Sequence, residues 1–140
     1  MAPIKKTPVF ISFDYDNDSD LKTLLVGQAK NPDSPFFIKD MSIKIETNTW
    51  KADARKRIKR AQLMIVICGL QTHKAIGVAE EIKIARDENI DFFLLRGRKK
   101  GIIRRPKETS WLWDQLYEWT WDNLRSMTAA KSEDWRRKVW

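Results

Sequence analysis

The stretch LMIVIC, residues 63–68, decides the fold, because it is the most apolar run in the chain. A continuous apolar run of this length is typical of a strand that is covered on both faces, as the central strands of parallel sheets are. Gly69 and Leu70 follow and lead out of the run. Residues 63–68 are therefore predicted to form the central strand of a sheet.

Further strands and helices are predicted to alternate on either side of this strand. Shorter apolar runs predict the other strands, and apolar residues at helical spacing predict the helices. Asp18 or Ser19 is expected to cap the first helix, and residues 40–48 are expected to form a loop or a short irregular strand. Strands are expected at residues 9–13, 36–38, 63–68 and 92–95, and helices at about residues 18–30, 50–61, 75–88 and 109–127.

This alternation predicts an α/β fold, a doubly wound parallel sheet of the flavodoxin type with four to five strands and flanking helices. At 140 residues the chain suits a single domain, 1–140, with a core of about 8–127 and a tryptophan-rich helical segment at 109–140. In such sheets ligands bind beyond the carboxyl ends of the strands, where the strand order reverses. That rule brings residues 13–20 and residues 69–81 together at one candidate crevice.

The charge balance favours an anionic partner. The chain carries 27 basic and 19 acidic side chains, a net charge of +8, and such a charge attracts nucleotides, nucleic acids or acidic proteins. A single cysteine excludes an internal disulfide, and no apolar run approaches the roughly 20 residues of a membrane span. We therefore expect a cytoplasmic protein without a membrane partner.

The row of alternating aspartates at positions 14, 16, 18 and 20 does not match a calcium-binding loop. An EF-hand loop that begins at Asp14 needs a glycine and a closing glutamate where this chain has Ser19 and Leu25. Cys68 and His73 are the only residues of their types, so no zinc ligand set is present. We expect no metal site, and neither a dinucleotide-binding glycine motif nor a Walker A motif occurs.

Four segments, in order and at consistent spacing, carry a family resemblance. They are VFISFDYDND at residues 9–18, FFIKDMS at 36–42, AQLMIVICGLQT at 61–72 and VAEEIKIA at 78–85. They resemble a first strand with an acidic continuation, a second strand with a D-x-S loop, a central strand ending in G-x-x-T, and a V-x-x-E-I-x-x-A helix. Together they resemble the TIR-like domain of the Thoeris antiviral defence family, which implies a flavodoxin/TIR-like fold.

The resemblance implies an NAD-consuming enzyme, an NAD glycohydrolase or ADP-ribosyl cyclase, with Glu81 as the catalytic residue. The implied reaction cleaves the nicotinamide glycosidic bond and gives ADP-ribose or a cyclised form, so NAD is the substrate and no cofactor is implied. Nicotinamide is already a cationic leaving group, and the barrier lies in the oxocarbenium charge that develops on the ribose. A carboxylate bonded to the ribose hydroxyls stabilises that charge.

Eight further residues are expected to bind the substrate. Ser12, Phe13 and Tyr15 are placed opposite the glutamate, and the ring of Phe13 or Tyr15 is expected to stack on a ring of the dinucleotide. Asp14 is assigned to the ribose hydroxyls. The resemblance also implies a contribution from residues 40–50, the loop after the second strand, often from a neighbouring protomer. The full expected set is Ser12, Phe13, Asp14, Tyr15, Asp40, Trp50, Thr72 and His73.

Two positions depart from the family pattern. Related sequences often carry tryptophans one residue before the valine and one residue before the glutamate, and here those positions hold Gly77 and Glu80. The loss of both aromatic groups changes the wall around the acid, and Glu80 adds a second negative charge. The surroundings of Glu81 are therefore expected to differ from those in relatives.

The resemblance also implies how the activity is used. We expect a homo-oligomer and a separate effector that responds to a diffusible cyclic ADP-ribose-type product, since the chain shows no second domain that acts on one. Two alternatives stay open: a non-catalytic TIR-like interaction module, and nucleic-acid binding through the basic residues 96–107. Nucleic acid is the least favoured partner. Trp113, Trp121 or Trp140 is a candidate for a partner interface, and simple packing is the alternative.

Overall fold

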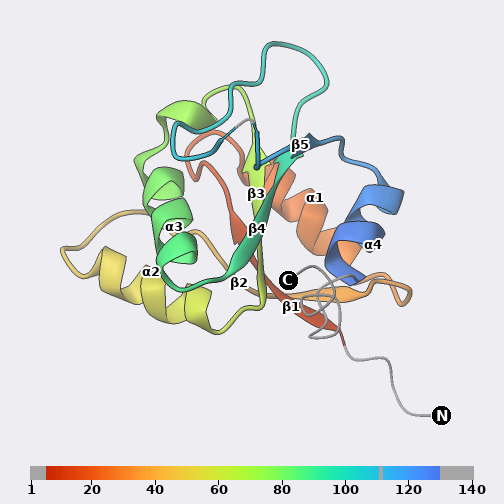
Figure 1. Cartoon of the computed structure of the whole chain (residues 1–140), viewed down its shortest axis with the longest axis horizontal. Helices are drawn as coiled ribbons and strands as arrows, with labels where there is room; N and C mark the ends of the chain where they lie inside the picture. The colour runs from red at the N-terminus through yellow and green to blue at the C-terminus, as the bar shows by residue number, and fades with distance from the viewer. Residues whose placement is uncertain (1–5, 111, 130–140) are drawn as a thin grey trace.

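The computed structural model describes residues 6–110 and 112–129. In these residues one sheet of five parallel strands lies between helices, and its strand order is β2-β1-β3-β4-β5 (Figure 1). The strands are β1 (Thr7–Ser12), β2 (Phe36–Met41), β3 (Leu63–Cys68), β4 (Asp91–Arg96) and β5 (Leu116–Tyr117). The helices are α1 (Ser19–Ala29), α2 (Trp50–Lys59), the 3₁₀ turn η1 (Thr72–Lys74), α3 (Ile76–Asp87) and α4 (Trp121–Ala129).

The strand predicted to be central is β3, and it occupies the middle of the sheet. All six of its residues are buried, and it pairs with β1 on one side and β4 on the other. The order of the sheet reverses between β1 and β3, as expected for a doubly wound fold of the flavodoxin type. The predicted α/β architecture is confirmed.

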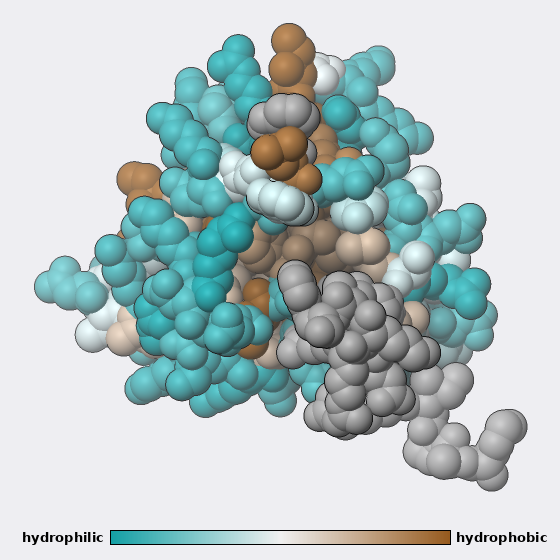
Figure 2. Space-filling model, in the orientation of Figure 1, coloured by the Kyte–Doolittle hydropathy of each residue, from teal (hydrophilic) through white to brown (hydrophobic). Residues whose placement is uncertain are grey.

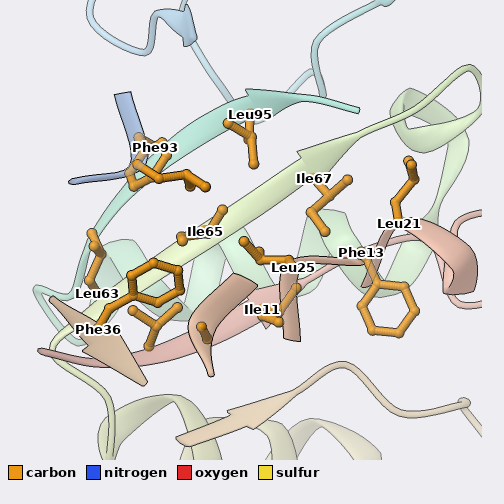
Figure 3. Close-up of a cluster of buried hydrophobic side chains, with 13 residues drawn as sticks. Ile11, Phe13, Leu21, Leu25, Phe36, Leu63, Ile65, Ile67, Phe93 and Leu95 are labelled. Atoms are coloured by element: carbon orange, nitrogen blue, oxygen red, sulfur yellow. The ribbon is translucent and has the colours of Figure 1, made fainter. Parts of the chain in front are cut away.

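The alternation of side chains along β3 divides the core into two layers. Leu63, Ile65 and Ile67 point to the face covered by α1 and α4, where the cluster in Figure 3 lies. Met64 and Val66 point to the opposite face, where α2 and α3 pack. Successive side chains of a strand face opposite sides of the sheet, so a strand with no polar residue needs helices on both faces.

The prediction of a helix at about residues 109–127 is wrong for the first half of that range. Residues before Leu116 form turns, Leu116 and Tyr117 pair with β4, and the helix α4 begins only at Trp121. Two polar interactions favour this arrangement. The Ser110 backbone N–H donates to the Asp114 carboxylate over 2.8 Å, and the Asn123 backbone N–H donates to Thr120 Oγ1 over 3.1 Å, which caps the later helix.

The segment between β4 and β5 projects from the end of the molecule at which the strands end (Figure 1). Three large apolar side chains of this segment are exposed, namely Ile102, Leu112 and Trp113. Figure 2 shows a mostly hydrophilic face with hydrophobic side chains gathered at that end. Leu112 therefore does not pack as the expected helix required, whereas Leu124 of α4 is fully buried.

Two of the three tryptophans predicted as candidates for a partner interface lie among the described residues. Trp113 is 83% exposed, and Trp121 packs against the core cluster under α1 and α4. Trp140 and the rest of the segment after residue 129 lie outside the described residues. Among the helices that are described, none is long and apolar enough to cross a membrane.

Candidate active site

A pocket opens at the carboxyl edge of the sheet, at the strand-order reversal between β1 and β3. Its volume is about 680 Å³, within the range of pockets that hold small ligands. Its wall comes from residues 13–17 after β1, residues 42–45 after β2, Trp50, and parts of residues 71–81. The two segments that the fold rule brings together, 13–20 and 69–81, do meet here.

Glu81 lies at the base of this pocket, in the second turn of α3, and is 1% exposed. The hydroxyls of Ser12 and Ser42 donate to the same carboxylate oxygen, Oε1, over 2.7 and 2.6 Å. The other oxygen, Oε2, is buried and has no hydrogen-bond partner among the described residues. A buried carboxyl oxygen without a partner costs free energy, and binding of a ligand at this oxygen is one explanation for that cost.

Burial raises the pKa of Glu81 from its ordinary value to about 7. The hydrogen bonds from Ser42 and Ser12 and the positive charge of Arg57 act in the opposite direction, because each favours the ionised form. A carboxyl group with this pKa exchanges its proton near neutral pH. It is therefore able to be an anion or a proton donor under the same conditions.

Glu80, the neighbouring acid, points away from the site. Its carboxylate forms ion pairs with Lys51 and Lys83, both at 3.6 Å, and it does not line the pocket. Successive residues of a helix project about 100° apart, so only one of two adjacent glutamates faces the sheet. The second negative charge noted in the sequence is thus neutralised at the surface.

Trp50 supplies the aromatic surface that position 77 lacks. A Cβ atom on Gly77 would lie 3.6 Å from the indole carbon Cζ2 of Trp50, so the indole covers this glycine. Trp50 is 5% exposed and lines the pocket, and its Nε1 is buried with no hydrogen-bond partner among the described residues. An aromatic wall is therefore present next to Glu81, built from the first residue of α2.

The acidic loop after β1 divides its roles between pocket and scaffold. Asp14 lines the pocket, and its carboxylate accepts hydrogen bonds from the Asp16 backbone N–H at 3.2 Å and from Asn17 Nδ2 at 2.7 Å. Phe13 and Tyr15 also line the pocket, and their rings stack on each other with centroids 6.1 Å apart. The loop thus presents one ordered carboxylate and an aromatic pair.

Four expected substrate-binding residues, Ser12, Asp40, Thr72 and His73, lie outside the pocket wall. Thr72 accepts from the Gly69 backbone N–H at 2.7 Å and donates to Asp18 Oδ2 at 3.1 Å. Asp40 forms a two-point ion pair with Arg57, and the Nε bond measures 2.8 Å. His73 belongs to η1 and does not line the pocket. Ser12 reaches the site through its bond to Glu81 rather than through the wall.

Sequence reasoning missed Ser42 and two lysines. Ser42 is the serine of the D-x-S loop, so the motif was visible although its contact with Glu81 was not. Lys44 and Lys74 line the pocket and have exposed side chains. Their only signal in the sequence was the general basic character of the chain.

Thiol chemistry and metal binding find little support in the described part of the chain. Burial raises the pKa of the Cys68 thiol to about 12, which keeps it protonated and unreactive at neutral pH. Among residues 6–110 and 112–129, no three acidic, histidine or cysteine side chains lie together in a way that holds a metal ion.

The comparison with protein families identifies the family of the chain. The family model for the Thoeris protein ThsB, TIR-like domain, matches residues 10–103. This range includes the second half of β1, β2 to β4, α1 to α3 and every pocket-lining residue. No curated protein matches the chain.

Proposed function

Because the chain belongs to the family of Thoeris ThsB TIR-like domains, we propose that it serves antiviral defence by cleaving the nicotinamide glycosidic bond of NAD. The observation that carries the proposal is the carboxyl group of Glu81, which lines a ligand-sized pocket. Two serines hold one of its oxygens, and the other has no hydrogen-bond partner in the part of the chain that the structure describes. In this proposal Glu81 is the catalytic residue and NAD is the substrate.

The ionised form of Glu81 performs the electrostatic part of the reaction. The C–N bond to nicotinamide breaks with its electron pair leaving on the nicotinamide ring, and positive charge develops on the ribose. A ribose hydroxyl donates to Oε2, and the negative charge stabilises the cationic transition state in a site with little water. Water then attacks the anomeric carbon and loses a proton to solvent, or a nucleophile of the same molecule attacks and gives a cyclised product.

Other pocket residues suit the remaining parts of a dinucleotide. Phe13, Tyr15 and Trp50 present aromatic surface for a nicotinamide or adenine ring. Lys44 and Lys74 present cations for the pyrophosphate. The wall thus offers both acidic and basic groups, which suits a substrate with a cationic ring and an anionic linker.

Exposed apolar side chains at the pocket support assembly into a homo-oligomer. Ile43, Ile45 and Ile76 all line the pocket, and they are 40%, 48% and 72% exposed. A neighbouring protomer that covers them would remove apolar surface from water and close the pocket. A cyclic ADP-ribose-type product released from such an assembly would act on a separate effector.

The same exposed side chains favour one alternative function, a non-catalytic interaction module that uses this surface only to assemble. The two functions differ in turnover. The enzyme releases nicotinamide from NAD, whereas the module oligomerises without any release.

The test is incubation with NAD under conditions that force assembly, followed by chromatography of the products. The wild type is expected to release nicotinamide, Glu81→Gln to lose about 100-fold to 1,000-fold in rate, and Glu80→Gln to remain close to wild type. Glu80→Gln is the matched control because it changes the same group on the same helix outside the pocket. Equal activity in Glu81→Gln and the wild type would reject the assignment.

A further inference from the structure

We propose that Ser12 and Ser42 are positioning residues that hold Glu81 by one oxygen and thereby dedicate the other, Oε2, to the ligand. The hydrogen bonds to Glu81 and their effect on its titration do not depend on which reaction the protein performs. The effect of the two serines on catalysis rests on the proposed NAD cleavage. The two serines come from different strands, so the carboxyl group is fixed by the sheet rather than by its own helix.

The three side chains converge from three elements of the fold. Ser12 is the last residue of β1, Ser42 follows the end of β2, and Glu81 projects from α3. They are 0%, 5% and 1% exposed, so water does not compete for their hydrogen bonds. Both hydroxyls donate to Oε1, over 2.7 Å from Ser12 and 2.6 Å from Ser42. Both distances lie within the normal range of O–H···O hydrogen bonds.

The main chain of β1 fixes the direction of the Ser42 hydroxyl. The Ser42 backbone N–H donates to the carbonyl of Ile11 over 2.8 Å, and the Phe13 backbone N–H donates to Ser42 Oγ over 3.0 Å. The hydroxyl has one hydrogen of its own, and Glu81 Oε1 at 2.6 Å is a closer acceptor than the Ile11 carbonyl at 3.4 Å. Ser42 is thus held by the main chain of residues 11–13 and in turn holds the carboxyl group of Glu81.

Two donors on one oxygen determine where the remaining proton goes. Oε1 is occupied by hydroxyl hydrogens, so a neutral Glu81 carries its proton on Oε2 and an ionised Glu81 presents Oε2 as an open acceptor. A ligand hydroxyl therefore meets Oε2. Without the serines the carboxyl group would rotate between equivalent orientations, and either oxygen would take either role.

The charged groups around Glu81 come from several parts of the fold, Lys44 and Lys74 of the pocket wall among them, and set the background for its titration. Arg57 of α2 favours the ionised form, and Asp40 of β2 partly neutralises that arginine through their ion pair. Asp14 lines the same pocket, and Glu80 is paired with lysines outside it. None of these groups is removed by changing a serine, so a serine substitution isolates the hydrogen bonds.

The direct test is NMR titration of the full chain labelled with ¹³C at the glutamate carboxyl groups, with Glu81→Gln to identify the resonance. Ser12→Ala and Ser42→Ala are each expected to raise the midpoint of Glu81 by about one pH unit or more, because each removes a hydrogen bond to the charged form. Ser42→Thr keeps a hydroxyl and is expected to restore a midpoint near that of the wild type.

Ser34→Ala is the matched control. Ser34 is also a buried serine, 3% exposed, and donates to the Phe36 carbonyl over 2.7 Å at the opposite end of β2. Its removal costs a buried hydrogen bond without touching Glu81, so the midpoint should not move. An unchanged midpoint in both Ser12→Ala and Ser42→Ala would overturn the proposal. The spectra of each variant also report whether it folds, and the two serines give independent tests.

Activity separates this proposal from the proposed function. If the wild type cleaves NAD, the pH-rate profile of Ser42→Ala should move upward by the same interval as its titration midpoint, with activity partly recovered at higher pH. If the rate of Ser42→Ala is lower at every pH and the midpoint of its pH-rate profile is unchanged, Ser42 only supports the fold, and the positioning role is overturned. If the wild type releases no nicotinamide while the titration midpoints move as expected, the proposed function fails and the positioning role holds.

Discussion

Two buried carboxyl groups lie near the carboxyl edge of the sheet, and their hydrogen bonds differ. Asp18 is 2% exposed, and both of its oxygens have partners: Thr72 donates to Oδ2 over 3.1 Å and Arg98 to Oδ1 over 3.2 Å. Glu81 is 1% exposed, and its Oε2 has no partner among the described residues. Burial raises the pKa of both groups, so burial by itself does not identify a site.

The difference between them lies in the hydrogen-bond partners of each oxygen. Asp18 stands at the N-cap position of α1 without a side-chain capping bond, and its carboxylate instead packs against Gly69, where a Cβ atom would lie 2.3 Å from Oδ2. It therefore joins three loops of the scaffold. Glu81 lines the pocket, and its buried Oε2 has no hydrogen-bond partner within the described ranges 6–110 and 112–129. A satisfied carboxylate holds the fold, and an unsatisfied one next to a pocket is available for a ligand.

The largest expected effect is on turnover. Glu81→Gln should reduce nicotinamide release by about 100-fold to 1,000-fold, because the developing ribose cation loses its counter-charge. Asp18→Asn should stay within a few-fold of the wild type in the same assay, since Asp18 does not line the pocket. Chromatographic measurement of nicotinamide from matched amounts of folded protein compares the two. A similar loss of nicotinamide release in both variants would contradict the assignment of Glu81 to catalysis and of Asp18 to the scaffold.

The second effect is on the pH dependence of stability. Burial raises the pKa of Glu81 in the folded protein to about 7 from its ordinary value of 4.5. The stabilisation of the folded state that Glu81 contributes is therefore fully present below the unfolded pKa and is lost as pH rises through the folded pKa. The free energy of unfolding should therefore fall by up to about 3 kcal/mol between mildly acidic and mildly alkaline pH. Glu81→Gln should remove this part of the decline, as denaturant titrations at several pH values will show. The same slope in both proteins would contradict the raised pKa.

A third effect concerns the scaffold carboxylate. Asp18→Ala should lower the free energy of unfolding by about 1–3 kcal/mol, because it removes a buried acceptor that serves Thr72 and Arg98. Asp20→Ala is the control, since Asp20 contacts the same arginine from an exposed position and should cost measurably less. Urea denaturation of the three proteins gives the comparison. An equal loss in both variants would mean that burial adds nothing at Asp18.

The smallest expected effect is on substrate affinity. Lys74→Ala and Lys44→Ala should each raise the KM for NAD a few-fold with little change in kcat, because an exposed cation contributes about 1 kcal/mol or less to binding an anion. Lys99→Ala is the matched control, since Lys99 is exposed and does not line the pocket. Steady-state kinetics at two salt concentrations measures the effect. An equal change for Lys99→Ala would indicate a general charge effect.

Local pattern was sufficient for much of the fold. The apolar run of β3 and the helical spacing of Val78, Ile82 and Ala85 in α3 depend on neighbours in the sequence, and the structure places all of these residues in the core. The start of the last helix was misplaced because pairing of Leu116 and Tyr117 with β4 is a long-range choice. Helical spacing carries no information about such pairing.

The sequence predicted the segments of the candidate site and five residues that line its pocket, namely Phe13, Asp14, Tyr15, Trp50 and Glu81. Position in a motif assigned Glu81 a role, but its bond to Ser42 joins residues 39 apart, and the bond of Asp18 to Thr72 joins residues 54 apart. Sequence spacing does not show which of two such acids keeps a free oxygen. Nor did it show that Trp50 covers Gly77, because that contact depends on how α2 packs against α3.

The central claim is that Oε2 of Glu81 meets the ribose next to nicotinamide, and a structure of the Glu81→Gln variant with NAD bound tests it most directly. The account predicts NAD in the pocket between residues 13–17 and α3, with a hydroxyl of that ribose about 2.6–3.2 Å from the substituted side chain at position 81. NAD bound elsewhere, or bound in the pocket with that ribose out of reach of position 81, would contradict it.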